Sequence, residues 1–112
     1  MFQVKNPIDQ RVLAEISYES ADAAEEKLDR AQEAFQQWKR VPLKERISRV
    51  SDALAYFSTH RDAIAQEIVD QMGKPIGEAL GEVGTMLERA ETMLALGEET
   101  LAPDVLPKDG FE

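Results

Sequence analysis

The pair Gly73-Lys74 is the first place in this chain where residue types could do chemistry, because a Gly-Lys pair closes the phosphate-binding Walker loop. That loop needs a glycine five residues before the pair and Ser or Thr after it, whereas this chain has Ile68 and Pro75. A glycine followed two positions later by proline is typical of a helix end. The sequence therefore predicts a helix stop and a helix start here, in place of a nucleotide site.

Three further glycines, Gly77, Gly81 and Gly84, lie at spacings of four and three on one side of a predicted helix. They do not form the Gly-x-Gly-x-x-Gly dinucleotide pattern, because their first spacing is four. Each glycine inside a helix costs roughly 1 kcal/mol relative to alanine, so three on one side need a reason. We expect the close approach of another backbone, either a strand or a helix; direct ligand contact is the less favoured alternative.

The single histidine, His60, and the acidic residues are the other candidates for chemistry. A lone histidine at a helix junction is typical of a cap or a surface residue. The absence of cysteine excludes thiol nucleophiles, disulfides and zinc–thiolate sites from these residues. We assign no catalytic, no cofactor-binding and no metal-binding residue. A solvated helix face accounts for the acids of the last predicted helix, which are Glu78, Glu82, Glu88, Glu91, Glu98 and Glu99.

Length and charge restrict the possible partners. A chain of 112 residues is one domain at most. Its 22 acids and 13 bases give a formal charge of −9, which opposes binding to nucleic-acid phosphates and to anionic membranes. The sequence has no run of about 18 apolar residues, and residues 1–5 lack the apolar core of a signal peptide. We expect a cytoplasmic protein with no nucleic-acid and no membrane partner.

The elements that would position these residues begin with a β-hairpin at residues 1–18. Residues 2–4 and 12–16 alternate apolar and polar side chains, and residues 6–10 between them supply turn chemistry. Because an isolated two-stranded hairpin is marginal in water, we expect it to lie on something larger.

Residues 20–101 carry the periodicity of four amphipathic helices. Ser20 is a good N-cap for the first, and Pro42 can open the second. A junction near residues 58–60 is expected to divide the second helix from a shorter third. The apolar faces, at spacings of three and four, are Ala24, Leu28, Ala31, Phe35 and Trp38; Leu43, Ile47, Val50, Leu54 and Phe57; Ile64, Ile68 and Met72; and Ile76, Leu80, Val83, Leu87, Ala90 and Leu94.

The predicted fold class is mainly α, with an N-terminal β-hairpin and four amphipathic helices. Residues 102–112 contain two prolines and a glycine, which indicates an irregular connector. A natural domain usually closes on a docked element or a polar tail. We therefore expect the chain to be a truncated part of something longer.

The order of motifs is more specific than any one of them: Asn6-Pro7, a short strand to Ile16, Phe35-Gln36-Gln37-Trp38, Pro42-Leu43-Lys44-Glu45-Arg46, Met72-Gly73-Lys74-Pro75, Glu78-Ala79 and Gly81-Glu82-Val83. From about Val4 to Leu101 this succession resembles the N-terminal region of the NAD(P)-dependent aldehyde dehydrogenase superfamily. Members often have Thr-Gly where this chain has Asp9-Gln10, and many have Glu-Thr where it has Gln71-Met72. Neither departure falls on a catalytic position.

The resemblance implies that the residues belong to an α/β, Rossmann-like nucleotide-binding domain in the intact enzyme. It also implies a reaction in which a cysteine thiolate attacks an aldehyde and hydride passes to NAD or NADP. Water activated by a glutamate then releases the acid, while an asparagine amide and a backbone N–H stabilise the oxyanion. All of those residues would lie beyond Glu112, so we expect the fragment to be inactive and to hold no cofactor.

Two functional hypotheses remain open. In the first, the chain is a fragment whose partner is the remainder of the parent enzyme, and which self-associates when alone because helix faces are left uncovered. In the second, it is a free-standing acidic helical bundle that serves as an interaction module. A third hypothesis, a small enzyme with carboxylate chemistry, has almost no support in the sequence.

Overall fold

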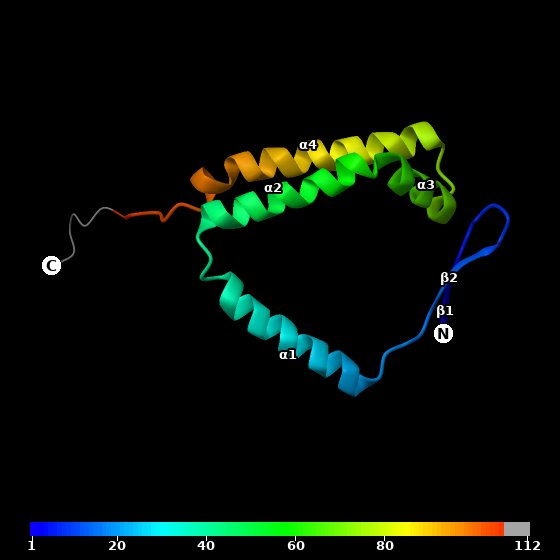
Figure 1. Ribbon diagram of the computed structural model, residues 1–112, viewed down its shortest axis with the longest axis horizontal. Coiled ribbons are helices and arrows are strands. Elements are labelled where there is room, and N and C mark those ends of the chain that lie inside the picture. The colour runs from blue at the N-terminus through cyan, green and yellow to red at the C-terminus, as the bar shows by residue number, and fades with distance from the viewer. Residues whose placement is uncertain (107–112) are drawn as a thin grey trace.

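The computed structural model describes residues 1–106 of the chain and is mainly helical, as predicted (Figure 1). Residues 101–106 form neither helix nor strand, and the rest of the predicted connector, 107–112, lies outside the described residues. The described elements, in chain order, are β1 (Phe2–Lys5), β2 (Val12–Ile16), α1 (Ala21–Trp38), α2 (Leu43–Thr59), α3 (Arg61–Met72) and α4 (Ile76–Thr100).

Strands β1 and β2 pair antiparallel, with Phe2 opposite Ile16 and Lys5 opposite Val12. The register shifts between Val4 and Lys5, where the chain enters the turn. This confirms the predicted hairpin. Most of its side chains are exposed, so the hairpin is held by its own ladder and by what its turn contacts.

Helix α1 begins where capping rules place it. The backbone N–H of Ala23 donates to Ser20 Oγ at 3.2 Å, which satisfies one of the unpaired donors of the first turn. The helix ends at Trp38, and Pro42 occupies the cap position before α2. Both boundaries agree with the sequence prediction.

Helices α2, α3 and α4 pack together into one layer, in which α4 contacts both of the others. The fully buried apolar residues among those described are Ala65 of α3 with Ala79 and Val83 of α4, at 0%, 0% and 2% exposure. Small side chains at this contact let α3 and α4 approach closely. The predicted junction near residues 58–60 is confirmed, because His60 separates α2 from α3.

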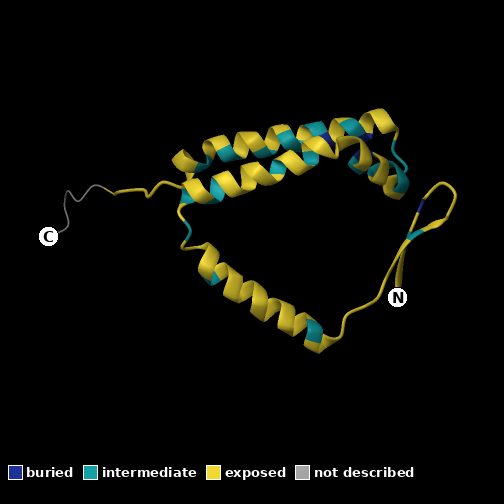
Figure 2. Ribbon diagram, in the orientation of Figure 1, coloured by how far each residue is buried: buried dark blue, intermediate teal, exposed yellow. Residues whose placement is uncertain are grey.

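Helix α1 stands apart from this layer (Figure 1). None of its residues is buried, and Figure 2 shows it almost wholly exposed. The described chain is consequently open, with extents of 71 × 40 × 26 Å. Four amphipathic helices do not cover one another here, so the bundle on which the interaction-module hypothesis depends is not formed.

Three residues of the faces predicted for α2, α3 and α4 are exposed, and one of them is Val50 of α2, at 41%. Met72 is 66% exposed and Ile76 is 48% exposed, because they flank the α3–α4 connection instead of facing the layer. Ala79 takes the buried place at the start of α4. Among residues 1–106, no helix has both the length and the apolar character required to cross a membrane.

Candidate functional site

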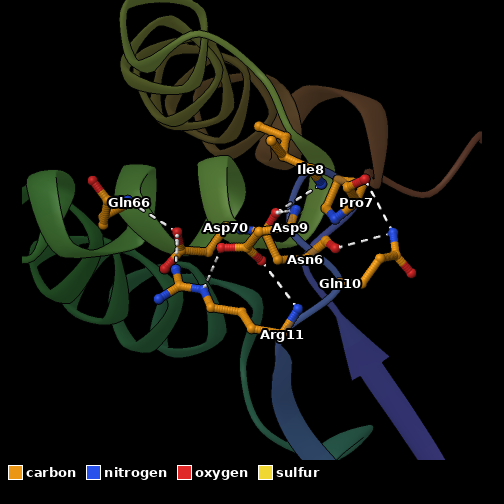
Figure 3. Close-up of polar contacts among 8 residues, drawn as sticks. All are labelled: Asn6, Pro7, Ile8, Asp9, Gln10, Arg11, Gln66 and Asp70. Atoms are coloured by element: carbon orange, nitrogen blue, oxygen red, sulfur yellow. Dashed lines mark hydrogen bonds and ion pairs between the residues drawn. The ribbon is translucent and has the colours of Figure 1, made fainter.

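The most organised polar cluster in the described chain surrounds the turn of the hairpin (Figure 3). Asn6 is its centre and is only 6% exposed. Its Oδ1 accepts from the backbone N–H groups of Ile8 at 2.8 Å and Asp9 at 3.4 Å. Its backbone accepts from Gln10 N–H at 2.9 Å and donates to Arg11 O at 3.0 Å. These bonds satisfy the side-chain oxygen and the backbone of Asn6 and fix the shape of the turn.

The same turn is tied to α3 by an ion pair. Arg11 Nη2 lies 2.8 Å from Asp70 Oδ1, and Gln66 Nε2 donates to the same oxygen at 3.2 Å (Figure 3). Asp9 Oδ2 approaches Arg11 Nε at 3.6 Å from within the turn. Because the Arg11 side chain is about half exposed, the ion pair contributes little to stability. Its main effect is to fix where the turn lies on α3.

The turn also packs on Gly73, at the corner between α3 and α4. Gly73 has φ +72°, which is the left-handed conformation predicted for this helix end. A Cβ at that position would lie 3.0 Å from Pro7 Cγ and 3.8 Å from Ile8 Cγ1. Glycine is therefore favoured at this position for two reasons: the backbone is left-handed, and the hairpin turn fills the space that a side chain would need.

An open hollow runs along α4 beside this corner, and it is lined by Lys74, Glu78, Gly81, Glu82, Thr85 and Arg89 among others. Lys74 and Glu82 form an ion pair there. The hydrogen bond to Glu82 raises the pKa of Lys74, and the charge of Glu78 acts in the same direction. The acids of α4 therefore favour the protonated form of Lys74.

The expected close approach at the glycine stripe is not found within the described chain. Apart from the adjacent backbone of α4 itself, no heavy atom lies within 4 Å of where a Cβ would stand at Gly77, Gly81 or Gly84. The reason is that α4 packs on α2 and α3 through its other side, around Val83. The sequence reasoning missed Gly97, where a Cβ would lie 3.3 Å from Ile47 Cδ1 of α2.

The apolar face of α1 is uncovered for most of its length. Leu28 is 69% exposed and Phe35 is 54% exposed. Only the last turn reaches the layer, where the Arg49 guanidinium lies 6.0 Å from the Trp38 ring centroid. Exposed apolar stripes of this kind are typical of surfaces that another segment or a partner covers.

His60 is a cap and surface residue, as predicted. Its ring stacks on Tyr56 with centroids 4.1 Å apart, and its Nδ1 lies 2.9 Å from the Tyr56 carbonyl oxygen at the end of α2. Across residues 1–106, no three His, Cys, Asp or Glu side chains gather in a way that could hold a metal ion. The organised side chains thus position elements against one another, and none of the described groups forms a nucleophile–base pair.

Comparison with known proteins gives these surfaces a context. The model of the aldehyde dehydrogenase family matches residues 1–111. N-succinylglutamate 5-semialdehyde dehydrogenase of Pseudomonas fluorescens (strain Pf0-1) is 35% identical over 88 residues, which cover 79% of this chain and 18% of that protein. Malonate-semialdehyde dehydrogenase of Bacillus subtilis subsp. natto is 31% identical over the same shares of each chain. The chain spans about a fifth of the length of these relatives.

A solved structure shows the same fold. Glyceraldehyde-3-phosphate dehydrogenase GapN from Methanocaldococcus jannaschii DSM 2661, complexed with NADP, superposes with a TM-score of 0.85 at 22% identity. The superposition covers 97% of this chain and 24% of that one. The open frame, with α1 apart from the helical layer, therefore also exists inside a much longer chain. The match over residues 1–111 places this chain in the aldehyde dehydrogenase family.

Proposed function

We propose that these 112 residues are the N-terminal segment of an NAD(P)-dependent aldehyde dehydrogenase that oxidises an aldehyde to a carboxylic acid. The main support is the difference in length. The family model matches residues 1–111, whereas the relatives are about five times longer than this chain. The family resemblance implies NAD or NADP as oxidant, and the GapN structure contains NADP. The relatives are named for different aldehydes, so we assign a reaction class and no single substrate.

On this proposal the segment supports the enzyme without entering its chemistry. The family's reaction begins with a cysteine thiolate, and the sequence contains no cysteine. The described residues build a frame instead: the hairpin turn fixes the α3–α4 corner, and α1 and α4 each present an uncovered face. The partner we assign to those faces is the remainder of the enzyme, within a Rossmann-like nucleotide-binding domain. A cytoplasmic location stays a prediction.

The glycine stripe supports this assignment in energetic terms. Glycine inside a helix costs roughly 1 kcal/mol relative to alanine, and nothing among the described residues uses the space at Gly77, Gly81 and Gly84. Glycine would be required on this side of α4 if backbone from the remainder of the enzyme packs against it, because any side chain there would prevent the close approach.

The first experiment reads the gene beyond the codon for Glu112. We expect an open frame of several hundred codons with a later cysteine and glutamate, and reduction of NAD(P)+ by the full-length product in the presence of aldehydes. A stop codon directly after Glu112 would overturn the proposal and return the free-standing module to first place.

A second experiment tests the assigned partner through one substitution, whose effect on the free energy of unfolding should have opposite signs in the short and the full-length chain. In the 112-residue chain, Gly81→Ala is expected to stabilise by roughly 1 kcal/mol, because the position is open and alanine favours helix. In the full-length protein, the same change is expected to destabilise, because a methyl group would meet packed backbone. Urea unfolding of both pairs measures this, and a stabilising effect in both would contradict the assigned partner.

A further inference from the structure

One residue of the hairpin turn has an unfavourable backbone conformation. Among the described residues other than glycine, only Gln10 lies in the left-handed region, with a φ of 62°. A side chain disfavours that region by a free energy comparable to what one hydrogen bond contributes. Such a residue persists only where its surroundings hold it. The turn must therefore contain contacts that offset the cost, at a position where glycine would avoid it.

The side chain of Gln10 supplies contacts of this kind. Its Nε2 donates to the carbonyl oxygen of Pro7 at 3.1 Å and to that of Asn6 at 3.4 Å (Figure 3). The backbone N–H of Gln10 donates to the same Asn6 oxygen at 2.9 Å. All three bonds run back across the turn, from residue 10 to residues 6 and 7. The residue with the unfavourable backbone is thus also the one that closes the turn.

These bonds lie between the two points at which the turn docks on the helices. On one side, Pro7 Cγ lies 3.0 Å from where a Cβ would stand at Gly73. On the other side, Arg11 follows Gln10 in the chain and lies 2.8 Å from Asp70. Each contact is small, and the spacing between Pro7 and Arg11 decides whether both can form at once. The bond from Gln10 to Pro7 acts on that spacing.

Two other side chains shape the same turn, but they act on different groups. Asn6 Oδ1 accepts from the backbone N–H groups of Ile8 and Asp9, and Asp9 Oδ1 accepts from the backbone N–H of Arg11 at 3.0 Å. Both are acceptors in these bonds. Because the Pro7 carbonyl needs a donor, neither oxygen can replace the Gln10 amide there.

We infer that Gln10 is a positioning residue for the docking of the hairpin: its side-chain amide holds the turn in the shape in which Pro7 meets Gly73 while Arg11 meets Asp70. Without that amide the left-handed backbone is unsupported, the turn relaxes, and the two contacts no longer form together. This role involves only residues 6–11 and the α3–α4 corner, so it does not depend on the proposed function.

The first test removes the donor from the 112-residue chain. Gln10→Met keeps an unbranched, uncharged side chain of similar length that cannot donate. Gln3→Met is the matched control, because Gln3 Nε2 donates to Glu15 at 2.7 Å across the strands. Both glutamines are exposed, so neither change is expected to prevent folding. We expect Gln10→Met to lower the protection of the Asn6 and Gly73 amide protons from hydrogen exchange by about threefold to tenfold.

The control should leave the protection of Gly73 unchanged, because the bond it removes lies away from the turn. Equal protection of Gly73 in Gln10→Met and in the unmodified chain would overturn the inference.

A glycine variant separates the side-chain bonds from the backbone strain. Gln10→Gly removes the donor and the strain together, whereas Gln10→Met removes the donor and keeps the strain. The expected order of Asn6 protection is the unmodified chain first, then Gln10→Gly, then Gln10→Met. Protection in Gln10→Gly equal to or above that of the unmodified chain would overturn the inference, because the amide would then contribute nothing that offsets its backbone.

A double substitution tests whether Gln10 acts beyond the turn. Asp70→Asn weakens the ion pair without changing the size of the side chain and should lower the protection of Asn6 by about twofold in the unmodified chain. In Gln10→Met the same change should have almost no further effect, because Arg11 is no longer held against α3. Equal losses in both backgrounds would overturn the positioning role, since Gln10 would then act on the turn alone.

Discussion

The α2–α3–α4 layer and α1 are built from the same kind of sequence and end in opposite environments. Both carry apolar residues at spacings of three and four, and both have well-formed ends. In the layer that pattern buries Val83, with Ala65 and Ala79 buried beside the predicted faces, whereas on α1 it leaves Leu28 and Phe35 facing solvent. Periodicity therefore predicts that a helix has an apolar face suited to burial. It does not predict whether residues 1–106 contain the segment that covers that face.

The largest expected difference between the two regions comes from a buried charge. Val83→Asp places a carboxylate at a position that is 2% exposed and should destabilise the layer by roughly 3–5 kcal/mol. Leu28→Asp on α1 is the matched change and should cost about 0.5 kcal/mol, through helix propensity alone. Circular dichroism during urea unfolding measures both, and similar costs would mean that α1 is packed after all.

The corner of the layer gives the next largest effect. Gly73→Ala should destabilise by about 1–2 kcal/mol from the left-handed backbone alone, and more if Pro7 cannot move away. Amide exchange should then show faster exchange in the hairpin turn as well as at the end of α3. If the turn keeps its protection, the hairpin does not depend on this corner.

Removing the N-cap of α1 tests whether this helix unfolds independently of the α2–α3–α4 layer. Ser20→Ala removes the bond to Ala23 N–H and should cost α1 about 1 kcal/mol. Because α1 shares little packing with the layer, the loss should appear as fraying at residues 21–24, with exchange rates in α2–α4 unchanged. Slower or faster exchange across the layer would show that the two regions unfold together.

The smallest effect is the pH dependence of the Lys74 and Glu82 pair. The pKa of Lys74 is raised in the folded chain, so the pair stabilises fully below about pH 10.4, the usual lysine value. That contribution is lost as pH rises through the folded-state pKa. Glu82→Gln should lower the pKa of Lys74, as followed by NMR titration, and should flatten the stability profile in the alkaline range. An unchanged titration would show that Glu82 does not act on this ammonium.

Local signals in the sequence predicted much of the fold. Ser20, Pro42, Gly73 and the junction at 58–60 act on their immediate neighbours, so the helix ends could be located from the chain itself. The docking of Pro7 on Gly73 could not be predicted, because it joins residues far apart and leaves no periodic signal. The backbone expected against the glycine stripe is not among the described residues, so periodicity alone could not identify it.

The ion pair between Arg11 and Asp70 has a consequence for the order in which the chain is made. These residues are 59 positions apart, which corresponds to roughly 3–12 s at a synthesis rate of about 5–20 residues per second. When α3 is being synthesised, the hairpin has already left the ribosome without the helix on which it docks. A lone two-stranded hairpin is marginally stable in water. The hairpin therefore reaches its docked position only after α3 has been made.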